Sequence, residues 1–175
     1  MYFRDVPNLG LWRTDFETGQ TLWSREMFVS YGLMPETHSP SVDVLMKYLH
    51  RDDRDMVSDA IHQATKSLTP FSFFHRIVRK DRSVRRLYSM GRFEIQENGK
   101  ATCRHGICLD LTALTKDEMK DVQNRLSVVT LPCLSVLLSL DASDKNMSIL
   151  LEVASMVNDR SRDRIARANS RSSLT

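Results

Sequence analysis

The sequence gathers histidine and acidic residues at one position where catalysis or metal binding has to be considered. His50 is followed by Asp52 and Asp53, in a polar segment between two apolar stretches. No nucleophilic side chain lies nearby, and carboxylates at this position suit the amides at the start of a helix. We therefore interpret His50 and Asp53 as structural residues, and we predict no catalytic residue and no enzyme.

The three cysteines do not form a metal site by their spacing. Cys103, Cys108 and Cys133 are odd in number, and no two of them have the two-residue spacing of a metal knuckle. Cys103 and Cys108 lie five residues apart on a predicted strand, so they point to opposite faces and are poor joint ligands. We expect reduced thiols and no metal.

A basic run from His75 to Arg86 is a candidate for binding phosphate or nucleic acid. Strand alternation divides these charges between two faces and a turn, so a solvated hairpin tip is the better interpretation. Arg76 lies on an otherwise apolar strand face. We expect it to form an ion pair with Asp110 or Glu94.

These residues belong to a predicted β-hairpin. The apolar runs Phe73 to Arg79 and Val84 to Ile95 flank a polar break at residues 80–83. Successive strand side chains point to opposite faces, and neither face of this hairpin is polar. A sheet built on it therefore needs a cover on both sides.

The remaining elements give the order strands, helices, strands. This order predicts an α+β fold in which helices gather on one face of an antiparallel sheet. The predicted elements are a hairpin from Leu9 to Ser24, helices from Ser24 to about Tyr31, from Ser41 to Tyr48 and from Asp53 to Lys66, and a strand from Ala101 to Leu111.

Length and charge indicate one compact domain with an extension. The chain has 175 residues, and its formal net charge of +3 is accounted for by five arginines and two aspartates between Asn158 and Thr175. The main body is thus close to neutral, which makes nucleic acid an improbable partner. No signal peptide or membrane helix is visible, so we expect a cytoplasmic protein without a membrane partner.

The C-terminal extension has helical apolar stripes. Met119, Val122, Leu126 and Val129 recur at helical spacing, and a later stripe includes Leu150 and Val157. These stripes favour either a partner-binding surface or helices that fold back over the sheet. The predicted division is an N-terminal arm (1–8), the sheet domain (9–114), a helical extension (115–160) and a basic, disordered tail (161–175).

The segment from Leu9 to Leu114 resembles a PAS sensory domain, particularly the subgroup found ahead of bacterial sensor histidine kinases. Order and spacing together carry the resemblance. The matching residues are Gly10, Trp12, Asp15, Gly19, Trp23, Ser24, Gly32, Leu33, His50, Asp52, Asp53, Arg54, Phe71, Arg76 to Arg79, Asp81, Ser83, Arg85, Gly91, Gly99, Gly106, Asp110 and Thr112.

This chain departs from the family pattern at three positions, Arg51, Arg82 and Leu111. The family commonly has Gly where this chain has Arg82, in the turn of the central hairpin. Gly tolerates a positive φ and Arg does not, so this turn either keeps φ negative or carries strain.

The resemblance implies a five-stranded antiparallel sheet, short helices over its inner face, a small pocket between them, and a helix that leaves the last strand. The residues expected to line the pocket are Phe28, Leu45, Val57, Ile61, Phe73, His75 and Ile77. The residues expected to hold the fold are Trp12, Trp23, His50, Asp53, Arg76 and Asp110.

No cofactor is predicted, although haem and non-covalent flavin stay open as alternatives. A flavin photosensor of this family has a cysteine on the pocket helix, and the segment from Asp53 to Ser67 contains none. A haem sensor needs an axial ligand, usually histidine. His62 is the only histidine in this helix, and its position beside Ile61 indicates a surface or boundary residue.

The leading hypothesis is a non-catalytic sensory or protein-interaction module of two-component signal transduction. We expect it to form a homodimer through its sheet face and C-terminal helices, and to relay to a kinase or response regulator. The alternatives are a one-component transcription regulator with a DNA-binding helical unit after Lys116, and a haem or flavin sensor. No histidine followed by an acidic residue occurs in the extension, so phosphoacceptor activity is not supported.

Overall fold

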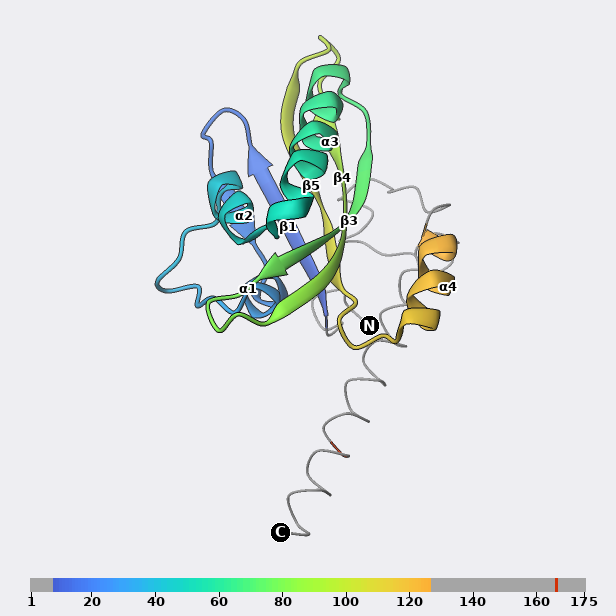
Figure 1. Cartoon of the computed structure of the whole chain (residues 1–175). Coiled ribbons are helices and arrows are strands. Elements are labelled where there is room, and N and C mark those ends of the chain that lie inside the picture. The colour runs from blue at the N-terminus through green and yellow to red at the C-terminus, as the bar shows by residue number, and fades with distance from the viewer. Residues whose placement is uncertain (1–7, 127–165, 167–175) are drawn as a thin grey trace, which may run out of the picture.

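The computed structural model describes residues 8–126 and residue 166, and shows a five-stranded antiparallel sheet with helices on its inner face (Figure 1). The strand order is β2-β1-β5-β4-β3. The strands are β1 (Leu9–Asp15), β2 (Thr21–Trp23), β3 (Phe71–Val78), β4 (Val84–Ile95) and β5 (Ala101–Asp110). The helices are α1 (Arg25–Tyr31), α2 (Val42–Tyr48), the 3-10 turn η2 (Arg51–Asp53), α3 (Arg54–Ser67) and α4 (Lys116–Leu126). The predicted α+β fold class is confirmed.

Some predictions concern residues outside the described part of the chain. Among the predicted interface residues these are Val129, Leu150 and Val157. Most of the N-terminal arm, the extension beyond Leu126, Cys133 and nearly all of the basic tail also lie there. None of the helices in the described part is long and apolar enough to cross a lipid bilayer.

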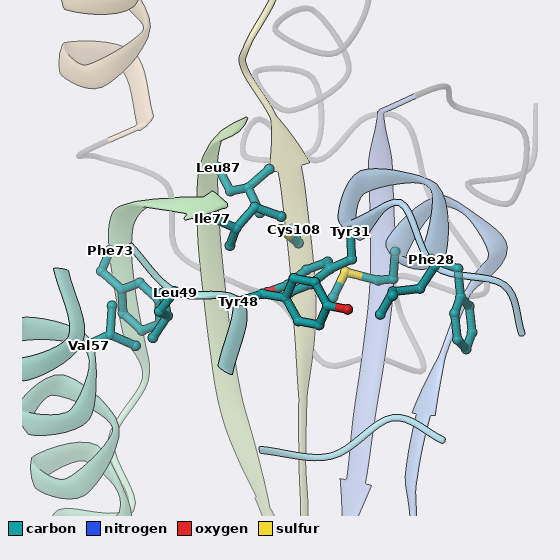
Figure 2. Packing of buried hydrophobic residues seen from close by; sticks show 11 residues of the cluster. Phe28, Tyr31, Tyr48, Leu49, Val57, Phe73, Ile77, Leu87 and Cys108 are labelled. Carbon is teal, nitrogen blue, oxygen red and sulfur yellow. The ribbon is translucent and has the colours of Figure 1, made fainter. Parts of the chain in front are cut away.

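Helices α1, α2 and α3 cover one face of the sheet, and α4 lies apart from them (Figure 1). The buried core lies between these helices and alternate residues of β3, β4 and β5 (Figure 2). Its members are Met27, Phe28, Tyr31, Leu33, Tyr48, Leu49, Val57, Phe73, Ile77, Leu87 and Cys108. The period-2 pattern of the strands thus supplies the inner side of the core.

The outer face of the sheet carries a group of apolar side chains, as the hairpin pattern predicted. The side chains that alternate with the inner ones include Leu9, Tyr88, Met90, Ile107 and Leu109. All five are buried within the single chain, and Val122 of α4 is also fully buried. In the described residues this face therefore offers no large exposed apolar patch.

Both ends of α1 use contacts that the sequence did not indicate. The Ser24 hydroxyl accepts from the amide of Leu11 at 3.0 Å and makes no cap bond to its own helix. Gly32 ends the helix with φ 66°. The Arg79 guanidinium donates to the carbonyls of Ser30 and Val29, which satisfies the last carbonyls of α1.

The β4–β5 hairpin contains one extra residue. Its turn uses Gly99 at φ 79°. Ile95 pairs with Ala101, whereas Glu94 pairs with Cys103, so Thr102 has no partner in the ladder. This bulge sets the register for the whole of β5.

In the β3–β4 turn, Arg82 adopts φ 64°, so this turn does not keep φ negative. We predict that Arg82→Gly stabilises the protein by about 0.5–1 kcal/mol. The left-handed conformation costs a non-glycine residue about 1–2 kcal/mol, and the extra chain entropy of glycine offsets about 0.5–1 kcal/mol of that gain. Urea unfolding would measure the difference.

Glu97→Gly is the matched control, because Glu97 lies in the neighbouring turn, is exposed and does not have a positive φ. It should destabilise the protein slightly. If both variants lower the free energy of unfolding equally, the strain attributed to Arg82 is absent.

Candidate ligand-binding site

A small cavity lies on the inner face, between β1, β2 and β5 and the helices. Its apolar lining comes from Trp12, Trp23, Met27, Val42, Leu45, Ile61, Phe71 and Phe73, and its polar lining from Thr14, Thr21, Ser41, Ser89 and Arg104. Counted as the space open to the centres of water molecules, its volume is about 60 Å³. Sites for drug-sized ligands and cofactors occupy about 300–1,000 Å³. The cavity as it stands therefore fits only a small ligand.

Two glycines make room for the tryptophan that forms one wall of this cavity. Gly91 and Gly106 face each other across β4 and β5, and the Trp12 ring lies over both. A Cβ on either glycine would lie 2.6 Å from ring atoms of Trp12. The Trp12 Nε1–H donates to the carbonyl of Ile107 at 3.3 Å, which fixes the ring. Trp12, predicted only as a structural residue, is therefore also part of the cavity wall.

Arg104 brings a positive charge to this otherwise mostly apolar cavity. It lies on β5 opposite Thr14 of β1, with its side chain half-buried. No hydrogen bond or ion pair joins its guanidinium to another described residue. Burial lowers the pKa of Arg104 from its ordinary value, and the group remains a cation at neutral pH. A half-buried cation without a partner is unfavourable, and an anionic ligand would relieve it.

The hydroxyls of Thr14 and Thr21 lie 3.1 Å apart in the same cavity. One hydroxyl donates to the other, so the second hydroxyl can donate to an anion held by Arg104. The cavity thus has a polar end with hydrogen-bond donors, and an apolar wall of aromatic rings. This combination suits a small organic anion.

The sequence identified only part of this cavity. Of the seven residues predicted to line a pocket, Leu45, Ile61 and Phe73 do so. Phe28, Val57 and Ile77 lie in the packed core instead, where side chains fill the space (Figure 2). Arg104 was not among the predicted pocket residues. It could have been found from its spacing, because Arg104, Gly106 and Cys108 are two residues apart on β5 and therefore lie on one face.

The start of α3 is joined to the edge strand β3 by an ion pair. Both oxygens of the Asp53 carboxylate accept from the Arg76 side chain, and Oδ2 also accepts from the Arg76 amide at 2.7 Å. These side-chain hydrogen bonds hold the pKa of the Asp53 carboxyl below its ordinary value. His50 adds a bond from its amide to the Arg76 carbonyl at 2.9 Å. The structural roles predicted for these three residues agree with this geometry.

Two details of that prediction are wrong. Asp53 makes no side-chain bond to the amides of its own helix, because its carboxylate is turned toward β3. Arg76 pairs with neither predicted partner: Asp110 is 3.5 Å from Arg85, and Glu94 is 3.6 Å from Arg13. Arg76 is on the edge strand, where the packed helix start lies nearer than either strand carboxylate.

A second hollow, the exit groove, lies where α4 meets the ends of β3 and β4. Its lining includes Asp53, His75, Arg76, Arg86, Leu111 and Met119. His75 was predicted for the inner pocket but lies here. Met119, a predicted interface residue, lines this groove, and Val122 of the same helix is buried.

The Asp110 to Thr112 segment and Arg86 fix the chain at the start of α4. Asp110 Oδ1 accepts from the amide and hydroxyl of Thr112. The Arg86 guanidinium donates to the carbonyls of Thr112 and Leu114. α4 then begins with a reciprocal cap, because Thr115 Oγ1 accepts from the Glu118 amide and the Glu118 carboxylate accepts from the Thr115 amide.

Comparison with known proteins agrees with this geometry. Residues 20–108, about half of the chain, match the family model described as the PAS fold. The chain belongs to the PAS-fold family. The resemblance seen in the sequence is thereby confirmed, and PAS domains are generally non-catalytic sensor modules.

Solved PAS structures share the fold at low identity. The N-terminal domain of a diguanylate cyclase with a PAS/PAC sensor from Marinobacter aquaeolei has a TM-score of 0.55 at 12% identity, over 59% of this chain and 95% of that one. A sensory box histidine kinase/response regulator from Burkholderia thailandensis has a TM-score of 0.53 at 20% identity, over 69% and 90%. A putative light and redox sensing histidine kinase domain from Haloarcula marismortui has a TM-score of 0.52 at 14% identity, over 62% and 93%. A search of curated proteins found no significant match.

The PAS cavity of this chain does not fit haem or flavin in this structure. Its volume is far below that of a cofactor site, and the rings of Trp12 and Trp23 form its walls. α3 carries no cysteine that would attack a flavin, and His62 on that helix is exposed. The residues present favour a smaller, charged ligand.

We predict that stability falls between about pH 6.5 and pH 4 because of His75. Burial lowers the pKa of His75 to about 4, although the nearby Phe73 backbone and the Asp53 carboxylate act in the opposite direction. Its ring nitrogens have no partner at hydrogen-bond geometry. The unfolded chain binds this proton near pH 6.5 and the folded chain does not, so up to about 3 kcal/mol is lost as the pH falls through this window.

Urea unfolding at several pH values, compared between the wild type and His75→Leu, would isolate this effect. The variant should lose less stability than the wild type over this range. His62→Leu, at an exposed position of α3, is the matched control and should behave as the wild type does. If the free energy of unfolding depends on pH in the same way in all three proteins, His75 has the same pKa in the folded and unfolded states, and the prediction is wrong.

Proposed function

We propose that this chain is a non-catalytic sensory module that binds a small organic anion in its inner cavity and relays the bound state to α4. The observation that carries the proposal is Arg104, a half-buried cation in the cavity without a partner among the described residues. A carboxylate held by Arg104 and by the one hydroxyl of the Thr14–Thr21 pair whose proton is free would complete the polar end of the cavity. The partner that receives the signal would be a kinase or response regulator.

A path from the cavity to α4 supports the relay. Arg104 is on β5, and β5 leads directly into the Asp110 to Thr112 segment. Arg86 of the neighbouring strand β4 holds the carbonyls that precede α4. A shift of β5 on ligand binding would therefore reach the start of α4 through hydrogen bonds that belong to the sheet.

We predict that short carboxylates, such as acetate, propionate and pyruvate, raise the thermal stability of the wild type and not of Arg104→Met. Methionine keeps an unbranched chain and removes the charge. A ligand at one hundred times its Kd stabilises the folded state by about 2.7 kcal/mol. Thermal unfolding with each salt, against potassium chloride at equal ionic strength, is the measurement.

Arg13→Met is the matched control, because Arg13 lies on β1 beside Thr14 and points to the opposite face of the sheet. It should retain the response of the wild type. Equal shifts in wild type and Arg104→Met would show that the anions act elsewhere. If no carboxylate in the panel shifts the wild type, a small carboxylate ligand is wrong.

We also propose that the chain forms a homodimer through its sheet face and C-terminal helices. Two features support this assembly: the apolar outer face of the sheet, and the amphipathic pattern of α4, whose Val122 is buried. Segments exchanged between two copies would cover the outer face as well as segments of one copy do.

Molecular mass in solution tests the assembly, for the full chain and for a version that ends at Leu114. We predict a dimer for the full chain, and a less stable monomer for the shortened one, because its outer face loses α4. Two monomers of equal stability would contradict any role of the extension in covering the sheet or in dimerisation.

A further inference from the structure

A second group of reactive side chains lies on the outer face of the sheet, away from the inner cavity. Cys103 and His105 are two residues apart on β5 and therefore point to the same side. Glu94 of β4 is directly opposite Cys103 in the ladder. Cys103 and His105 are fully buried, and the Glu94 carboxylate is partly exposed to solvent. The three side chains thus bring a thiol, an imidazole and a carboxylate together.

The distances within this group match those of ligands around one metal ion. Cys103 Sγ lies 3.1 Å from Glu94 Oε2 and 3.7 Å from His105 Nδ1, and Glu94 Oε1 lies 3.7 Å from His105 Nδ1. Zinc bonds to sulfur, nitrogen and oxygen are about 2.0–2.3 Å long, which puts neighbouring ligands of a tetrahedral site about 3.3–3.7 Å apart. Little movement is needed to place an ion between the sulfur, the ring nitrogen and one of the two carboxylate oxygens.

We infer that Glu94, Cys103 and His105 form a zinc-binding site with three protein ligands and one open position. Zinc is the divalent ion that best accepts this mixture of sulfur, nitrogen and oxygen in tetrahedral geometry. On binding, the Cys103 thiol gives its proton to solvent and the sulfur–zinc bond replaces the hydrogen bond to Glu94. Thiolate and carboxylate together neutralise the two charges of the ion, and the site ties β4 to β5.

Charged residues near the three ligands affect how strongly a cation binds to them. The Arg13 guanidinium of β1 is 3.6 Å from Glu94 Oε2, and its positive charge opposes a cation there. Asp15, opposite Cys103 on β1, does not compete as a ligand, because its carboxylate accepts from Thr18 and from the amide of Glu17 in the adjacent turn. Arg92 of β4, opposite His105 in the ladder, adds a second positive charge. Arg13 lies against the Glu94 carboxylate itself, so its removal should tighten binding.

Cobalt and zinc titrations of the full-length, reduced protein without a histidine tag test this inference. Co²⁺ should bind at one equivalent and give a thiolate-to-cobalt charge-transfer band in the near ultraviolet, and Zn²⁺ should displace it and raise the thermal stability. Cys103→Ser keeps a hydrogen-bond donor toward Glu94 but should lose the band. Cys108→Ser and Cys133→Ser are the matched controls and should retain it.

Two further variants separate a metal site from a purely structural cluster. Glu94→Gln keeps the shape of a partly exposed side chain, so it should fold and bind Zn²⁺ at least about 100-fold more weakly, since loss of an outer partner alone costs about 10–100-fold. Arg13→Gln should bind several-fold more tightly. The absence of a charge-transfer band in the wild type, its survival in Cys103→Ser, or unchanged affinity in Glu94→Gln would each overturn the inference.

Discussion

The pairing of β1 with β5 is the contact on which the rest of the sheet depends. Seven residue pairs join these strands, although they are separated by nearly the whole length of the domain. Without them the β1–β2 hairpin would not be paired with the rest of the sheet. Trp12 of β1 would then lose its packing against Gly91 and Gly106. The same pairing sets Thr14 beside Arg104 on one face, and Arg13 beside His105 on the other. Closing so long a loop has an entropy cost, which the buried apolar faces of the central strands offset.

Much of the fold could be predicted because it follows from local patterns. Alternating apolar residues and an Asn-Gly turn define the hairpins, and helical spacing with Ser41 as a cap defines α2. The partner of Arg76 could not be found in this way. Its pair with Asp53 joins residues 23 positions apart and exists only because α3 packs against the edge of β3. A sequence pattern indicates on which face of an element a side chain lies. It does not indicate which side chain of another element contacts it.

The cavity was harder to predict than the fold for a related reason. Apolar residues at helical spacing can either fill a core or line a pocket. Which of the two occurs depends on how large rings pack against glycines, which have no side chain. Here the decisive fit is that of Trp12 over Gly91 and Gly106, which involves three strands. The outer cluster was missed because the cysteines were compared only with each other. The alternation of Cys103 and His105 was visible, whereas the approach of Glu94 depends on the register across a turn.

The register between β4 and β5 determines where insertions and deletions can be tolerated. Thr102 is the one extra residue on β5, and it lies between the turn and the part of the strand where Arg104 faces the helices while Cys103 and His105 face away. Deleting Thr102 would give a continuous ladder and leave both groups on their own faces. Deleting His105 would instead turn Arg104 to the outer face and Cys103 to the inner face. In evolution, insertions and deletions should therefore accumulate at the bulge and on its turn side and be excluded beyond it, because the continuous register of Cys103 to Gly106 with β4 keeps two separate kinds of chemistry on opposite sides of one strand.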